Sequence, residues 1–266
     1  MAQLEHAGAS IHWYSVGSGE PLLMLMGLGC SSAMWFRLAP RLARHHRVIL
    51  MDNRGVGGTD VKYQVVHRVT TMAADVAAVL DAAGESSAHV LGFSMGGMIA
   101  QEFALMYPQR LRSLILASTN CGGSNTVLPP SEVWGLLFDK GRMTPEQSLH
   151  AMRPYTYDAG TPESLIVEDH QVRLDSYPET RGYQAQLYGL MCWSSYSRLA
   201  QVQSPTLVIH GNNDKLIPPL NADILVRAIA SARLVKLGHA SHMIATDQLA
   251  LTADEIRSFL HEGRRP

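Results

Sequence analysis

Short, continuously apolar runs alternate with helix-like runs along most of the chain, and this alternation constrains the fold more than any other feature. Residues 21–27 (PLLMLMG) and 47–51 (RVILM) lack the every-second-residue pattern of a strand with one solvated face. Such strands are buried on both faces, as in a parallel sheet covered by helices. Similar runs occur at residues 88–93, 113–118, 206–210 and 233–237. The sequence therefore predicts an α/β fold, with a mostly parallel central sheet and helices on both faces.

The alternation stops between about residues 121 and 203, where no buried-strand run occurs, and it resumes at residue 206. We therefore expect one α/β core domain, formed by residues 1–120 and 204–266, and a helical lid, residues 121–203, inserted between two strands. In the first part of the core, residues 11–14 are expected to form an edge strand and residues 32–44 a helix.

Composition excludes several classes of protein. Apolar residues make up 46% of the chain, which excludes a disordered protein, and a net charge of −1 gives no reason to expect a nucleic acid or a membrane as partner. Residues 1–15 lack the features of a signal peptide, and three distant cysteines (Cys30, Cys121 and Cys192) favour a reducing compartment. We expect a cytoplasmic protein that acts on a small molecule without a cofactor or metal. The oligomeric state stays open, a homo-oligomer included.

One short motif indicates chemistry. Residues 92–96 read Gly-Phe-Ser-Met-Gly and lie where the strand at residues 88–93 should turn into a helix. The serine backbone is strained at such a turn, and small residues two positions before and after it avoid a collision. The turn lifts the hydroxyl clear of the sheet, and the helix N-terminus favours developing negative charge. Ser94 is therefore a candidate nucleophile, although a solvated serine in a glycine-rich turn has the same pattern.

A serine nucleophile needs a base, and the base needs a carboxylate that orients it. Both groups should lie in loops after later strands. Asp214 is the only carboxylate in the loop after residues 206–210, and the loop after residues 233–237 contains His239 and His242. Asp214 also suits a helix cap, and the two histidines suit a metal pair, but no third ligand is evident. The chain order Ser, Asp, His favours catalysis.

Together these motifs resemble those of the α/β-hydrolase superfamily over essentially the whole chain. Within the superfamily they most resemble the esterase, enol-lactonase and carbon–carbon hydrolase branches. The matching segments are Gly27-Leu28-Gly29, Asp52-Asn53-Arg54-Gly55, Gly92-Phe93-Ser94-Met95-Gly96-Gly97, Asp214 and the histidine loop. The resemblance implies that Ser94 attacks an acyl carbonyl, that His242 takes its proton and that Asp214 holds His242. It also implies an oxyanion hole formed by the backbone N–H groups of Leu28 and Met95.

His242 is preferred over His239 because of its position. Relatives commonly carry an acidic residue about five positions after the catalytic histidine and a Phe-Leu pair about seventeen positions after it. From His242 these offsets reach Asp247 and Phe259-Leu260. Four residues also separate His242 from the strand end at Leu237, whereas one separates His239 from it. The longer connection lets the imidazole swing back over the serine.

Two further features concern the substrate site. Many relatives have His-Gly before the oxyanion loop, whereas this chain has Met26-Gly27, so the loop needs another support. The inserted segment is rich in aromatic side chains, which predicts an apolar, aromatic-lined pocket. The candidates for contact with substrate are Trp35, Trp134, Phe138 and Trp193. Core packing is at least as good an interpretation of Trp35, and attachment of the lid to the core is the better interpretation of any single aromatic side chain of the inserted segment.

The expected reaction is hydrolysis of a carboxylic ester of a small, mainly apolar molecule through an acyl-enzyme. An enol-lactonase, a carbon–carbon bond hydrolase and a cofactor-free perhydrolase would use the same three side chains. An acyltransferase and a non-catalytic ligand receptor on the same scaffold are alternatives of another class. Serine rather than aspartate at position 94 argues against dehalogenase or epoxide hydrolase chemistry, which uses a carboxylate nucleophile.

Overall fold

A computed structural model of the protein describes residues 2–62 and 65–262, with only the backbone of residues 140 and 141. Residues 1, 63–64 and 263–266 of the expected core lie outside the described residues. The strands are β1 (Ala2–His6), β2 (Ala9–Val16), β3 (Glu20–Leu25), β4 (His46–Met51), β5 (Asp60–Val61), β6 (Ala88–Phe93), β7 (Leu111–Ala117), β8 (Thr206–Gly211) and β9 (Ala232–Leu237). The helices are α1 (Ala39–Leu42), α2 (Val69–Ala82), α3 (Met95–Met106), α4 (Ser131–Phe138), α5 (Pro145–Thr156), α6 (Glu163–Asp175), α7 (Thr180–Met191), α8 (Leu220–Ala228), α9 (Ile244–Asp247) and α10 (Leu249–Glu262).

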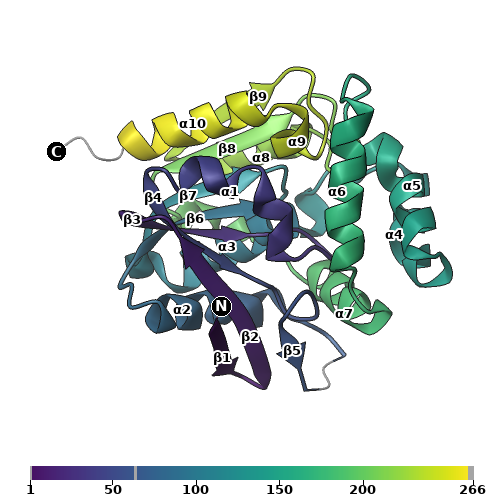
Figure 1. Ribbon diagram of the computed structural model, residues 1–266. Coiled ribbons are helices and arrows are strands. Elements are labelled where there is room, and N and C mark those ends of the chain that lie inside the picture. Colours follow the sequence, from purple (N-terminus) through teal and green to yellow (C-terminus); the bar gives the residue numbers. More distant parts are fainter. Residues whose placement is uncertain (1, 63–64, 263–266) are drawn as a thin grey trace.

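The strands form one mixed sheet with helices on both faces, which confirms the predicted fold class (Figure 1). The strand order is β1-β2-β4-β3-β6-β7-β8-β9, and β5 pairs with β2. All pairings from β4 to β9 are parallel, whereas β2 pairs antiparallel with β1, β4 and β5. Because the parallel strands share one direction, their carboxyl ends meet at one edge of the sheet, and loops from distant parts of the sequence lie close together there.

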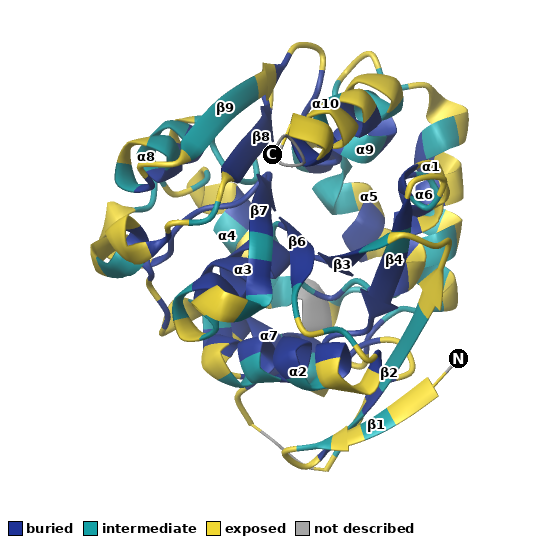
Figure 2. Ribbon diagram, turned by 90° about the vertical axis from the view of Figure 1, so that its left-hand side faces the viewer, coloured by how far each residue is buried: buried dark blue, intermediate teal, exposed yellow. Residues whose placement is uncertain are grey.

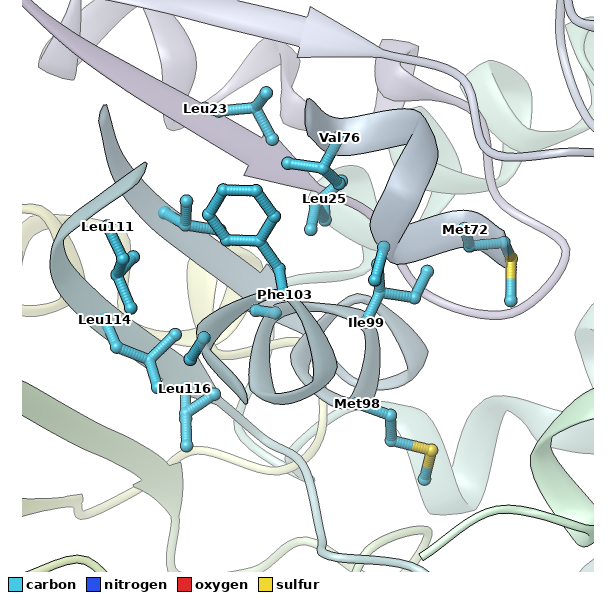
Figure 3. Close-up of a cluster of buried hydrophobic side chains, with 14 of the residues drawn as sticks. Leu23, Leu25, Met72, Val76, Met98, Ile99, Phe103, Leu111, Leu114 and Leu116 are labelled. Atoms are coloured by element: carbon cyan, nitrogen blue, oxygen red, sulfur yellow. The ribbon is translucent and has the colours of Figure 1, made fainter. Parts of the chain in front are cut away.

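The central strands are apolar at successive positions because each face of the sheet has its own helical layer. On β3, Leu23 and Leu25 belong to a cluster with side chains of α2 and α3, whereas Leu22 and Met24 belong to a cluster with side chains of α1 and α10. Figure 2 shows the result, with buried central strands and an exposed β1 at the edge. Figure 3 shows Phe103 of α3 within the first cluster.

Two predictions of local structure were wrong. Residues 11–14 lie in β2, which is not an edge strand, because β1 pairs with one side of it and β4 with the other. The helix expected over residues 32–44 is divided into a 3-10 turn, Ser32–Phe36, and the single turn α1. Pro40 lies in the first turn of α1. A proline has no N–H group to extend a preceding helix, so it fits where a new one begins.

Between β7 and β8 the chain leaves the sheet. Residues 121–203, which we call the insertion, contain α4 to α7, and the described residues there make only an isolated β-bridge, between Gly122 and Ser194. Figure 1 shows these helices gathered at one side of the sheet. Asp169 of α6 is buried and accepts hydrogen bonds from Arg37 Nε (3.1 Å) and Thr246 Oγ1 (2.6 Å) of the core. None of the described helices has the length and apolar character needed to cross a membrane.

Candidate active site

Ser94 lies at the turn between β6 and α3 in a conformation that only tight packing can enforce. Its backbone has φ 55° and ψ −119°, a region that costs about 1–3 kcal/mol for a residue with a side chain. The flanking glycines leave the necessary space, because a Cβ on Gly92 would overlap the carbonyl oxygen of Gly96. The Ser94 N–H group donates to a β7 carbonyl (2.9 Å), and the Thr119 hydroxyl donates to the Ser94 carbonyl (2.7 Å). These bonds hold the turn.

His242 and Asp214 come from loops that follow neighbouring strands. Asp214 follows β8 and His242 follows β9, and both side chains are buried. His242 Nδ1 lies 2.8 Å from Asp214 Oδ2. The second carboxylate oxygen, Oδ1, accepts from the backbone N–H groups of Leu216 (2.9 Å) and Ile217 (2.8 Å). Since an ionised carboxylate only accepts, Nδ1 of the imidazole carries the proton and Nε2 is left as the acceptor.

The pKa of Asp214 lies below its ordinary value. Burial raises this pKa, but the charge of His242 and hydrogen bonds from His210 and His242 outweigh the effect of burial. His210, which is fully buried on β8, places Nε2 3.2 Å from Asp214 Oδ2 and 2.8 Å from the Ile217 carbonyl oxygen. Asp214 therefore remains ionised as the pH falls below the ordinary range of an aspartate. Sequence reasoning missed His210, which reads simply as the end of a buried strand.

Ser94 and His242 line the same cavity, whose volume is about 360 Å³. Core residues Leu28 and Met95 form one part of its wall, and side chains from the insertion form most of the rest, among them Trp134, Leu137, Leu149, Tyr183, Leu187 and Leu190. The wall is mainly apolar. The arrangement joins a hydroxyl, an imidazole and a carboxylate at an apolar cavity, at the carboxyl ends of the parallel strands.

A family model described as the alpha/beta hydrolase fold matches residues 20–155, about half of the chain. The chain belongs to the α/β-hydrolase family. This α/β-hydrolase is 30% identical over 248 residues to a poly(3-hydroxyalkanoate) depolymerase of Ectopseudomonas oleovorans, covering 92% of this chain and 86% of the relative. It is also 30% identical to a 2-hydroxy-6-oxo-6-phenylhexa-2,4-dienoate hydrolase of Comamonas testosteroni, covering 87% and 84%. A solved esterase of Exiguobacterium antarcticum superimposes with a TM-score of 0.89 at 25% identity, covering 98% of this chain and 99% of that chain.

Leu28 and Met95, the two residues predicted to donate to an oxyanion, both line the cavity of the α/β-hydrolase beside Ser94. Met95 is the first residue of α3, so its N–H group has no partner within the helix. Leu28 lies in residues 26–30, which we call the β3 loop. Among the described residues, neither backbone N–H group has a hydrogen-bond acceptor. Two unpaired donors beside a serine hydroxyl are what an oxyanion hole requires.

The β3 loop is held from two sides in the absence of the histidine found in many relatives. Asn53, a buried residue that follows β4, donates from Nδ2 to the Met26 carbonyl (3.0 Å). On the other side, the N–H group of Gly29 donates to Oε1 of Gln186 on α7 (2.8 Å). Gly29 has φ 66°, a conformation that favours glycine. Sequence reasoning missed Gln186 because no motif marks it.

The two histidines of the loop that follows β9 have different environments. His239 is exposed and has φ 52°, and its carbonyl accepts from Gln248 (3.1 Å). His242 is buried and contacts Asp214 as described. Asp247 accepts from the N–H group of Ser241 (2.7 Å) and from the backbone and side chain of insertion residues 158 and 161. This carboxylate therefore fixes the loop that carries His242. No cluster of three or more metal-binding side chains occurs in the part of the chain that the structure describes.

Of the four aromatic residues predicted to contact substrate, only Trp134 lines the cavity among the described residues. For the other three the prediction is corrected. Trp35 is buried and packs edge-on against Phe93 at 6.3 Å, Phe138 is exposed and stacks on Trp134, and Trp193 is buried with its Nε1 donating to Glu102 (2.7 Å). The composition of the insertion predicted an aromatic wall. However, Trp35 packs in the core and Trp193 binds a buried carboxylate, so neither side chain contributes to the wall.

One charged side chain in the cavity wall has no counterpart in the sequence prediction. Arg173 of α6 lines the cavity and forms none of the salt bridges among the described residues. The neighbouring α6 carboxylates, Glu168 and Asp169, pair with Arg37 instead. Arg153 of α5, by contrast, forms a salt bridge with Glu163. A half-buried guanidinium with no anionic partner, inside an apolar cavity, can bind a substrate anion.

Proposed function

We propose that this α/β-hydrolase cleaves a carboxylic ester through a covalent acyl-enzyme on Ser94. The proposal rests on one observation: Ser94, on its strained turn, and His242 line the same cavity. Nδ1 of His242 lies 2.8 Å from the Asp214 carboxylate, which leaves Nε2 for the serine. In the proposed first step, Ser94 Oγ attacks the ester carbonyl and His242 Nε2 takes its proton. The N–H groups of Leu28 and Met95 stabilise the oxyanion. The ester C–O bond breaks as His242 returns the proton to the leaving alcohol.

In the second step, His242 removes a proton from water, which attacks the acyl carbonyl. The bond to Ser94 Oγ then breaks, and the proton from His242 restores the serine hydroxyl. Relatives with names that describe ester cleavage support this reading, among them the depolymerase and a pimeloyl-[acyl-carrier protein] methyl ester esterase. The dienoate hydrolase supports a second candidate, carbon–carbon bond hydrolysis, which needs the same groups.

The test is turnover of p-nitrophenyl esters, lactones and vinylogous 1,5-diketones, combined with fluorophosphonate labelling measured by intact mass. We expect ester turnover and one label per chain, at Ser94. Turnover of the diketones alone would favour carbon–carbon hydrolysis. Stoichiometric labelling without any turnover would contradict the proposal and favour a ligand receptor.

Asp214→Asn should lower kcat for ester hydrolysis by about 10⁴-fold, because an asparagine favours the wrong imidazole tautomer. The amide can donate to Nδ1, which leaves the proton on Nε2, where the nucleophile needs an acceptor. Steady-state kinetics measures the effect. Asp254→Asn is a matched control, since Asp254 is exposed on α10 and pairs with Arg257 three residues later. A loss of less than tenfold for Asp214→Asn would remove Asp214 from the mechanism.

The cavity wall indicates the substrate class. We propose an acyl group that is mainly apolar and carries one acidic group, which Arg173 binds. Monomethyl adipate should therefore have a kcat/KM about tenfold above that of methyl hexanoate, because a hydrogen bond to a charged group contributes about 1.5–3 kcal/mol. These esters have the same chain length and differ in the terminal carboxylate. Arg173→Met should abolish the preference and leave kcat/KM for methyl hexanoate unchanged. A preference for the neutral ester in the wild-type enzyme would contradict the assignment.

A further inference from the structure

Helix α7 packs against the core more closely than ordinary side-chain contact allows. A Cβ on Gly182 would overlap the carbonyl oxygen of Gly55, and a Cβ on Gly189 would overlap that of His67. Between these two glycines, the carbonyl of Ala185 accepts from the N–H group of His67 (2.9 Å). The positions 182, 185 and 189 are spaced so that they share one face of a helix. This face therefore has a fixed position on the core.

Gln186 lies next to this face and joins two backbone groups of the core. Its side chain is fully buried. Oε1 accepts from the N–H group of Gly29 in the β3 loop (2.8 Å), and Nε2 donates to the carbonyl of Arg54 (2.7 Å). A backbone N–H group can only donate and a carbonyl can only accept, so the orientation of the amide is determined. The opposite orientation would lose both bonds.

The Arg54 end of this bridge is rigid. The guanidinium of Arg54 is fully buried and forms a two-point ion pair with Asp75, at 2.6 Å from Nε and 2.8 Å from Nη2. It also donates to the carbonyls of His6 and Ala7 on the edge of the sheet. The amide of Gln186 therefore connects Gly29 to a backbone segment that is itself held in place. Gly29 is one residue from the Leu28 N–H group.

We propose that Gln186 is a positioning residue that sets the Leu28 N–H group in the oxyanion hole, an inference that rests on the proposed ester hydrolysis. Asn53 holds the start of the β3 loop through Met26, and Gln186 holds it after the donor. With both ends held, the unpaired N–H group between them cannot rotate away from the cavity.

Gln186→Met tests this assignment, because methionine fills the same space without accepting from Gly29 or donating to Arg54. We expect kcat to fall about 10- to 100-fold with KM within about threefold of wild type. Direct loss of one oxyanion donor costs about 10²–10³, and a misplaced donor costs less. The Ki of an octyl trifluoromethyl ketone, whose adduct carries an oxyanion, should rise by the factor by which kcat/KM falls. Gln184→Met is the matched control on the same helix, outside the cavity that Ser94 lines, and should keep wild-type kinetics.

Gln186→Glu separates positioning from stability. Its carboxyl oxygen still accepts from Gly29, so kcat should follow the order Gln, Glu, Met. Burying a carboxylate costs more than burying a thioether, so Tm should follow the order Gln, Met, Glu. The same order for kcat and Tm, or kcat of Gln186→Met equal to that of Gln184→Met, would overturn the proposal. Failure of both variants to fold would also overturn it, as a purely structural role. Absence of ester turnover in the wild-type protein would instead contradict the proposed function.

Discussion

Ser94→Ala should lower kcat for ester hydrolysis by about a million-fold while the protein stays folded. In a serine triad, loss of the nucleophile costs about as much as loss of the whole triad. Alanine keeps the Cβ, so it meets the same backbone strain at φ 55° and the same packing, and Tm should change little. Steady-state kinetics and thermal unfolding measure the two effects. More than a few per cent of wild-type kcat, in protein free of contaminating esterase, would contradict the assignment of Ser94.

Ser118→Ala provides a control for the turn itself. Ser118 is a buried serine directly after β7, it has φ 46°, and it lies outside the residues that line the cavity. Its positive φ angle therefore resembles that of Ser94, whereas its hydroxyl has no proposed role. Wild-type kcat in Ser118→Ala and loss of kcat in Ser94→Ala would assign the effect to the Ser94 hydroxyl rather than to the removal of a serine from a strained position.

His242→Ala should lower kcat by a factor similar to that for Ser94→Ala, whereas His239→Ala should lower it by about tenfold or less. His242 is the only proposed base, and triad members act as a unit. His239 is exposed on the same loop, so its removal affects only the position of the loop. Kinetics of the two variants with one p-nitrophenyl ester gives the comparison. The opposite ranking would show that the choice of histidine is wrong.

The parts of the fold that were predicted correctly depend on local pattern. Strand β3 is buried on both faces, and its continuous apolar run shows this without any knowledge of its neighbours. By contrast, β1 is exposed at most positions, so its residues lack an apolar pattern, and its pairing with β2 could not be predicted. The division of residues 32–44 has a local signal in Pro40, which the prediction of one continuous helix did not use.

The residues of the candidate site also differ in whether a local sequence pattern marks them. Ser94 has a motif, and Asp214 and His242 follow strands in a characteristic order, so these residues could be found in sequence. Gln186 and Arg173 have no such signal, because their roles depend on contacts that only folding creates. Gln186 is 157 residues from Gly29 along the chain. No local pattern can predict which buried amide will meet which loop.

Helix α7 has a consequence for the evolution of new substrate ranges. Its residues Tyr183, Leu187 and Leu190 touch the cavity, while Gln186 between them holds the β3 loop. A substitution that reshapes this part of the wall also moves the helix that positions the proposed donor, so selectivity and turnover change together. Helix α4 lines the cavity but does not hold the β3 loop, since none of its described residues forms a hydrogen bond with that loop. Directed evolution for new substrates therefore has more freedom at Trp134 and Leu136 of α4, where the wall can vary while the chemistry stays in place.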